Sequence, residues 1–225
     1  MRNKFYLLFV MMCIGIVSFA QNTNVQDPLS GKKFGIIGDS YVRNHREPVE
    51  NTWHYKFAKK HHMQYFNYGI NGNCVAMNRG RFGEAMYTRY KKVMADSLDY
   101  VVVVAGHNDA TLLDSIGGID KYKEKLNILC EGLIERYPKA KIFFFTSWDC
   151  KNFTGSNFEK VVDATKEVCG AHSIPVFDCA RYSGVHAESD TFRKIYFQSP
   201  DDHAHLNAKG HDLFLPRAES FILQY

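Results

Sequence analysis

Several features that define other classes of protein are missing from this 225-residue sequence. It has six cysteines but no Cys-x-x-Cys pair, so a cysteine-based zinc site is not indicated. Its net charge of +4 is too small to indicate a nucleic-acid partner. No linker, internal repeat or low-complexity segment interrupts the chain. With 45% hydrophobic and 23% charged residues, its composition is typical of one ordinary folded domain.

The sequence also lacks an apolar run long enough to span a bilayer. The longest, over residues 5–17, is shorter than the roughly 20 residues required, which argues against stable membrane insertion. Arg2 and Lys4 flank it, and Ser18-Phe19-Ala20 has the small-x-small pattern of a cleavage site. We therefore expect a signal peptide over residues 1–20, cleaved near Ala20, and a periplasmic or secreted protein. Loss of those two basic residues leaves a net charge of +2 on the mature chain.

Cysteine use fits an exported protein without requiring disulfides. Cys13 would leave with the signal peptide. Export permits a disulfide, and Cys150 with Cys179 is a conceivable pair because both follow expected strands. The remaining number is odd, so at least one thiol stays unpaired, and we expect most of them to be buried and free: Cys74, Cys130, Cys150, Cys169 and Cys179.

What the sequence does contain is an alternation of short apolar runs and helical patterns. Expected strands lie at residues 33–37, 65–67, 100–105, 142–145 and 174–177, and expected helices at 52–61, 83–97, 119–137, 158–171 and 207–225. This alternation predicts a single α/β domain over residues 32–225, after a polar leader at 21–31, with a mostly parallel five-stranded sheet covered by helices on both faces. Pro216 falls within the last helical pattern and is expected to kink it or start a new helix.

Ligands of such sheets bind outside the carboxyl ends of the strands, so polar residues there are candidates for chemistry. Ser40 follows the first strand on a tight turn, which would present its hydroxyl as a nucleophile and its amide as an oxyanion donor. Gly72 has no Cβ and so lets its backbone amide approach a ligand closely. Asn108, after the third strand, offers a side-chain amide as a further oxyanion donor.

A serine hydroxyl needs a base, and histidine suits that role near neutral pH. His205 is our candidate base. Asp202, three residues earlier, can fold back onto the imidazole, hold its tautomer and stabilise its protonated form. The pair lies just before the last expected helix.

Together these segments resemble the four ordered blocks of the SGNH hydrolase (GDSL-like lipase/esterase) family. The blocks are Gly38-Asp39-Ser40, residues 67–72, Gly106-His107-Asn108-Asp109 and Asp202-His203-Ala204-His205. The resemblance implies a flavodoxin-like three-layer α/β/α sandwich. It also implies a catalytic triad of Ser40, Asp202 and His205, an oxyanion hole of Ser40, Gly72 and Asn108, and no metal or organic cofactor.

Two positions depart from the common family pattern. Tyr41 follows the nucleophile where a leucine or isoleucine is frequent, and His107 stands between the glycine and asparagine of the third block. Neither residue is expected to perform chemistry. The departures bear on subfamily and substrate rather than on mechanism.

Simpler interpretations of single residues also exist. Ser40 alone would more often be a helix N-cap than a nucleophile, and Asp39 is expected to stabilise its turn. His203 and His205, with the adjacent aspartates, could hold a metal, but no further histidine has a recognisable ligand spacing. Asn207 is expected to cap the last helix, and His211 to be structural.

The sequence gives weaker indications of the substrate and of the residues that contact it. Trp148, Tyr182 and Tyr196 lie in or beside two expected loops, 149–157 and 180–199, that could wall the cleft, although ordinary surface is the alternative. Export and a near-neutral charge favour a small acyl group, such as acetyl, on a carbohydrate or glycan. The alternatives are a lipase or lysophospholipase, and a non-catalytic glycan-binding module on the same fold.

Overall fold

A parallel sheet of five strands forms the centre of the molecule. In the computed structural model, which describes residues 27–150, 152 and 155–225, the strands are β1 (Lys33–Gly38), β2 (Gln64–Gly69), β3 (Tyr100–Val104), β4 (Lys141–Phe145) and β5 (Val176–Phe177). Their order is β2-β1-β3-β4-β5, and every neighbouring pair is parallel. This is the flavodoxin-like order, so the prediction of a mostly parallel five-stranded sheet is confirmed.

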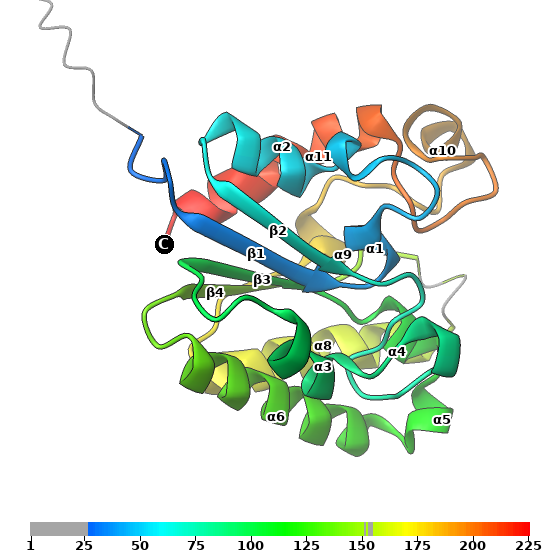
Figure 1. Ribbon diagram of the computed structural model, residues 1–225. Coiled ribbons are helices and arrows are strands. Elements are labelled where there is room, and N and C mark those ends of the chain that lie inside the picture. Colours follow the sequence, from blue (N-terminus) through cyan, green and yellow to red (C-terminus); the bar gives the residue numbers. More distant parts are fainter. Residues whose placement is uncertain (1–26, 151, 153–154) are drawn as a thin grey trace, which may run out of the picture.

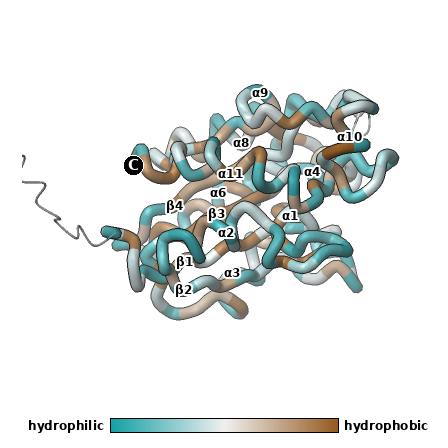
Figure 2. The backbone as a smooth tube through the Cα atoms, turned by 90° about the horizontal axis from the view of Figure 1, so that it is seen from above, coloured by the Kyte–Doolittle hydropathy of each residue, from teal (hydrophilic) through white to brown (hydrophobic). Residues whose placement is uncertain are grey.

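Helices cover both faces of this sheet and complete a three-layer sandwich (Figure 1). One face packs against α2 (Trp53–Lys60) and α11 (Ala208–Leu223), and the other against α3 (Met86–Val93), α6 (Ile119–Arg136) and α8 (Asn157–Ala171). All five correspond to helical patterns in the sequence. The central strand β3 is buried along its whole length because both of its faces are covered. Seen from above, hydrophobic stretches run through the middle of the molecule and hydrophilic ones lie mainly at its periphery (Figure 2).

Short helices follow the carboxyl ends of the strands and bring polar residues to that edge. They are α1 (Ser40–Arg43), α4 (His107–Thr111), α5 (Leu113–Ile116), α9 (Cys179–Tyr182) and α10 (Asp190–Tyr196). The interpretation of residues 180–199 as a loop was therefore wrong in part. Ser189 caps α10 by accepting a hydrogen bond from the Phe192 amide, and a helix of seven residues, about two turns, is too short to show a clear periodic pattern.

The last helix also differs from expectation. α11 continues through Pro216 as one helix, so no new helix starts there. Asn207 caps it by accepting a hydrogen bond from the Gly210 amide, as predicted. His211 is buried in it and hydrogen-bonded to Asn44, in line with a structural role.

The cysteines that remain after the expected cleavage are all buried, and no disulfide joins Cys150 to Cys179 in this structure. The predicted signal peptide, residues 1–20, and most of the leader at 21–31 lie outside the described residues. Within the described part of the chain, no helix combines the length and apolarity needed to cross a bilayer.

Candidate active site

Ser40 begins α1 directly after β1, at the edge of the sheet where the strands end. The N-cap of this helix is Asp39, whose carboxylate accepts a 2.9 Å hydrogen bond from the Tyr41 amide, which confirms its turn-stabilising role. Ser40 itself is 8% exposed. Among the described residues, its amide N–H has no acceptor. A nucleophilic hydroxyl and an unpaired amide are therefore present in the same residue.

Gly72 supplies a second unpaired amide. Its φ of +73° is in the left-handed region, and a Cβ would lie 2.8 Å from the ring of Phe82, so glycine is required here. Its carbonyl accepts a 2.6 Å hydrogen bond from Arg79, which fixes the orientation of this peptide. The Gly72 amide donates to no acceptor in the described part of the chain.

Asn108, the third predicted oxyanion donor, is already hydrogen-bonded. Its side-chain Nδ2 donates to Asp39 Oδ2 at 2.9 Å and to the Asn73 carbonyl at 3.1 Å. These bonds connect the turns that follow β1, β2 and β3. To donate to an oxyanion, Asn108 must share or exchange one of them.

Two buried carboxyl groups support these turns. Burial raises the pKa of Asp39 to about 7, although the Tyr41 amide and the charge of His205 act in the opposite direction. Burial likewise raises the pKa of Asp109 to about 6. Asp109 accepts hydrogen bonds from the amides of Val75 and Ala76, and so holds the segment that follows Gly72.

Asp202 and His205 form the expected hydrogen-bonded pair before α11. His205 Nδ1 lies 2.9 Å from Asp202 Oδ2, and Asp202 Oδ1 also accepts the His205 amide. Burial alone would raise the pKa of Asp202, but hydrogen bonds from His205 and from the Ala204 and His205 amides, together with the charge of His205, lower it. The carboxylate therefore stays ionised and holds the Nδ1 hydrogen.

The other ring nitrogen, His205 Nε2, is buried and has no hydrogen-bond partner among the described residues. No hydrogen bond joins it to Ser40 in this structure, although the charge of His205 acts on Asp39, the residue before Ser40. His205 lines a cavity of about 420 Å³. Such a base–nucleophile bond is frequently long without substrate. The cavity is lined by His45, Arg46, His107, Ser199, Asp201, Asp202, His203, Ala204 and His205.

A metal site at this cavity would need ligands from His45, Asp202 and His205. One donor atom from each lies within 4.8 Å of the others. The rings of His45 and His205 are stacked, with centroids 4.2 Å apart and 12° between their planes. Nitrogen lone pairs lie in the ring plane, so nearly parallel stacked rings do not converge on one ion. The arrangement suits a triad better than a metal.

The three residues predicted to contact substrate are not among those that line this cavity. Trp148 is only 3% exposed and packs on Tyr41, with ring centroids 4.4 Å apart. Tyr182 is 66% exposed, at the end of α9. Tyr196 packs on Phe192 at the end of α10. None of these three tyrosine and tryptophan side chains lines the cavity of His205.

Sequence reasoning missed two residues of the site. His45 follows α1 with a φ of +45°, and only the fold stacks it on His205. Arg89 of α3 is 3% exposed and donates to the carbonyls of Gly38 and Tyr68 at the ends of β1 and β2. A single arginine in a helical pattern does not indicate such a role. For His45, the only indication in the sequence was the number of histidines near the motifs.

Comparison with known proteins identifies a family and several similar folds. The model of the GDSL-like lipase/acylhydrolase family matches residues 36–213. A search of curated proteins found no match. A solved structure from Lactobacillus plantarum is 21% identical with a TM-score of 0.73, and the match covers 87% of this chain and 98% of that one.

Two solved esterases are also similar. An acetylxylan esterase from Geobacillus stearothermophilus is 16% identical, with a TM-score of 0.61 and coverage of 87% of this chain and 96% of that one. A family two carbohydrate esterase from Clostridium thermocellum is 17% identical, with a TM-score of 0.65 and coverage of 86% and 63%. At such identities these structures establish a shared fold.

Proposed function

This chain belongs to the GDSL-like lipase/acylhydrolase family and is an ester-hydrolysing serine hydrolase, and from this premise we propose that it removes a small acyl group, acetyl above all, from a carbohydrate or glycan. The proposed triad is Ser40, His205 and Asp202. The proposed oxyanion donors are the amides of Ser40 and Gly72 and the side chain of Asn108. We further propose that the enzyme acts in the periplasm or outside the cell, as the expected signal peptide implies.

The proposed reaction has two acyl-transfer steps. Ser40 Oγ attacks the ester carbonyl carbon while His205 Nε2 takes its proton, and the amide donors stabilise the negative oxygen. His205 then gives the proton to the departing alcohol as the carbon–oxygen bond breaks, which leaves an acyl-serine. Water, deprotonated by His205, attacks this acyl-enzyme, and the proton returns to Ser40 as the acid leaves. Asp202 stabilises the imidazolium in both steps.

One observation supports this mechanism more than any other. His205 is bonded through Nδ1 to an ionised aspartate, while its Nε2 is buried and unpaired beside a polar cavity. An unpaired buried nitrogen costs stability in a folded protein, and the role of proton acceptor would account for this one. A base of this kind has a use in an esterase and none in a module that only binds sugar.

The lining of the cavity supports a polar alcohol. It consists of histidine, aspartate, arginine and serine side chains, with Ala204 as the apolar exception. A long acyl chain would bury little apolar surface against such walls. Hydroxyl groups of a sugar would find donors and acceptors there. The two esterases described above, which act on carbohydrate according to their names, are consistent with the same class.

Initial rates on a set of esters test the proposal. The chain from Gln21 and its Ser40→Ala variant are incubated with p-nitrophenyl acetate, butyrate and palmitate, and with an acetylated oligosaccharide. We expect Ser40-dependent release of acetate, and rates that fall with acyl length. Equal rates in the two proteins would reject Ser40 as nucleophile, and a preference for palmitate would favour the lipase alternative. Sugar binding without turnover would favour a binding module.

A further inference from the structure

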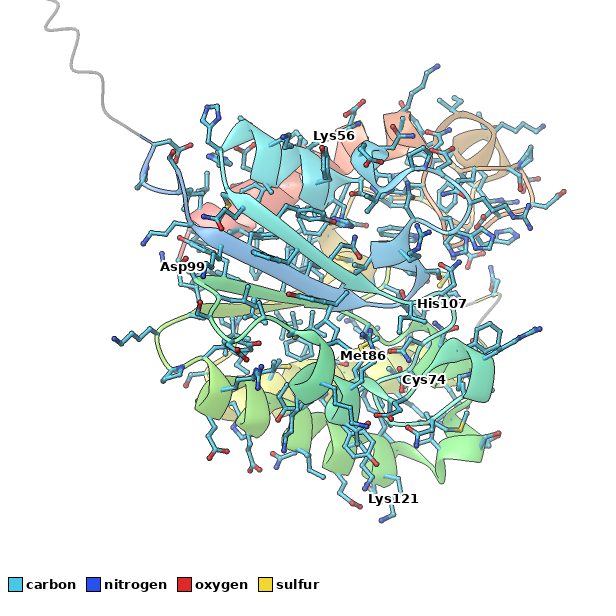
Figure 3. The ribbon with its side chains drawn as sticks, viewed as in Figure 1. Lys56, Cys74, Met86, Asp99, His107 and Lys121 are labelled. Carbon is cyan, nitrogen blue, oxygen red and sulfur yellow. The ribbon has the colours of Figure 1, made fainter. Side chains whose placement is uncertain are left out.

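His107, which the family pattern leaves without a role, lies at the active-site cavity. It begins α4 at the carboxyl end of β3 and lines the same cavity as His45, Asp202 and His205. Figure 3 shows His107 beyond the ends of the strands, at the edge of the sheet where the site lies. The charge of His205 acts on His107, consistent with their closeness.

Nδ1 of His107 contacts side chains of the protein itself. Nδ1 lies 3.2 Å from the hydroxyl of Tyr41 and 3.4 Å from the sulfur of Cys150. Tyr41 is itself fixed, because it is buried and packs against Trp148. The two residues that depart from the family pattern, Tyr41 and His107, therefore act as one pair.

The protonation states of this pair follow from their burial. Burial raises the pKa of the Tyr41 hydroxyl well above its usual range, so it keeps its hydrogen and can donate. Burial lowers the pKa of His107 to about 4, so the ring is neutral near pH 7 and carries one N–H. We assign Nδ1 as the acceptor of the Tyr41 hydroxyl, which places that hydrogen on Nε2.

The Nε2 atom of His107 forms no hydrogen bond with the described residues. Because His107 lines the cavity, we infer that this N–H is available to a ligand there. In the proposed mechanism His205 hands its proton to the leaving alcohol, so the alcohol portion of the ester must lie beside His205. His107 faces that same space.

We propose that His107 is a specificity-determining residue whose Nε2–H donates to an oxygen of the alcohol portion, a hydroxyl or ring oxygen of a sugar, and that Tyr41 positions it by occupying Nδ1. This inference rests on the proposed function and specifies its substrate side. One such hydrogen bond changes relative affinity by about 3- to 10-fold.

Substrate discrimination tests this assignment. For wild type and His107→Phe, kcat and KM are measured on an acetylated oligosaccharide and on p-nitrophenyl acetate, whose alcohol portion has no sugar oxygens. We expect His107→Phe to lower kcat/KM for the sugar ester about 3- to 10-fold, mainly through KM, and to change that for p-nitrophenyl acetate less than about 2-fold. An equal loss on both substrates would overturn the proposal, because it indicates a structural role.

Two further variants serve as controls. His107→Gln keeps an N–H donor and should retain most of the discrimination, while Tyr41→Phe removes the hydroxyl that holds Nδ1 and should lose part of it. Thermal unfolding of each variant shows whether it folds.

Binding in a Ser40→Ala background separates this inference from the proposed function. If His107→Phe weakens binding of the acetylated oligosaccharide there by about 3- to 10-fold, the inference holds even where the wild type shows no turnover. Unchanged binding overturns it.

Discussion

The imidazole of His45 lies flat on that of His205, with ring centroids 4.2 Å apart and 12° between the planes. Asn44 and His45 both adopt left-handed backbone conformations after α1, which turns His45 back towards the cavity. Burial and the charge of His205 lower the pKa of His45, so near pH 7 its ring is uncharged where it packs against His205. Stacking of this kind restricts rotation of the base about its bond to Asp202.

We expect His45→Ala to lower kcat/KM about 3- to 10-fold, because His205 loses this ring contact and samples unproductive orientations. His45→Phe keeps a flat ring and should stay within about 2-fold of wild type. Steady-state kinetics on p-nitrophenyl acetate measure both. Equal losses in the two variants would show that the nitrogen atoms of His45, and not its ring face, are what matter.

Asp202→Asn should lower kcat by about 10³- to 10⁴-fold, because a neutral amide neither fixes the tautomer nor stabilises the imidazolium. The lowered pKa of Asp202 also predicts the pH profile. Hydrogen bonds keep Asp202 ionised as the pH falls, so the acid limb of the kcat–pH profile should correspond to one proton and should not include protonation of Asp202. A slope indicating two protons would contradict this prediction.

Asn108→Ala should lower kcat about 10²- to 10³-fold if the side chain donates to the oxyanion. The same change removes the hydrogen bonds to Asp39 and the Asn73 carbonyl, so some stability should also be lost. Kinetics and urea unfolding of the variant separate the two effects. Activity comparable with wild type would assign Asn108 to support of the turns alone.

Arg89→Met should lower the free energy of unfolding by about 2–4 kcal/mol. Arg89 is buried and satisfies the carbonyls of Gly38 and Tyr68 and the side-chain oxygen of Asn73, all of which would lose a partner. Urea unfolding at neutral pH measures the loss. The exposed Lys91→Met on the same helix is the control and should change stability by less than about 0.5 kcal/mol. Comparable stabilities for both variants would refute the role of Arg89.

His54 should make the protein less stable in acid. It is fully buried, and burial lowers its pKa to about 3, so between about pH 6.5 and 3 the unfolded chain binds a proton that the folded protein excludes. Relative to His54→Gln, the wild type should therefore lose up to about 1.4 kcal/mol of unfolding free energy per pH unit as pH falls through this window. Above it neither state is protonated and the difference should be constant.

Urea unfolding of both proteins at several pH values between 7 and 4 measures this effect. The raised pKa values of Asp39 and Asp109 act in the opposite direction, but they are common to both proteins and cancel in the comparison. Parallel stability curves would show that His54 becomes protonated in the folded state.

Most of the architecture follows from local patterns. The buried run at residues 101–104 and the alternation of apolar runs with helical periods were enough to predict a parallel sheet covered on both faces. Short helices, such as α9 and α10, could not be predicted because one or two turns of helix show no clear period. Of the two alternatives expected at Pro216, a new helix is wrong, because α11 tolerates the hydrogen bond that proline cannot donate.

Part of the candidate site could also be predicted from the sequence. Ser40, Gly72, Asn108, Asp202 and His205 could be named in advance because each lies in a short motif at a chain position that the alternation of elements brings to one edge of the sheet. Each of these residues can therefore be recognised from its immediate neighbours in the sequence.

The sequence alone was therefore enough to predict the order of elements, the edge of the sheet that carries the candidate site and the candidate residues at that edge. Three contacts could be seen only in the folded protein: His45 stacks on His205, Tyr41 contacts Nδ1 of His107, and Arg89 connects the ends of two strands. These contacts join residues from different elements, and their geometry depends on how the elements pack. No periodicity or spacing along the chain encodes it.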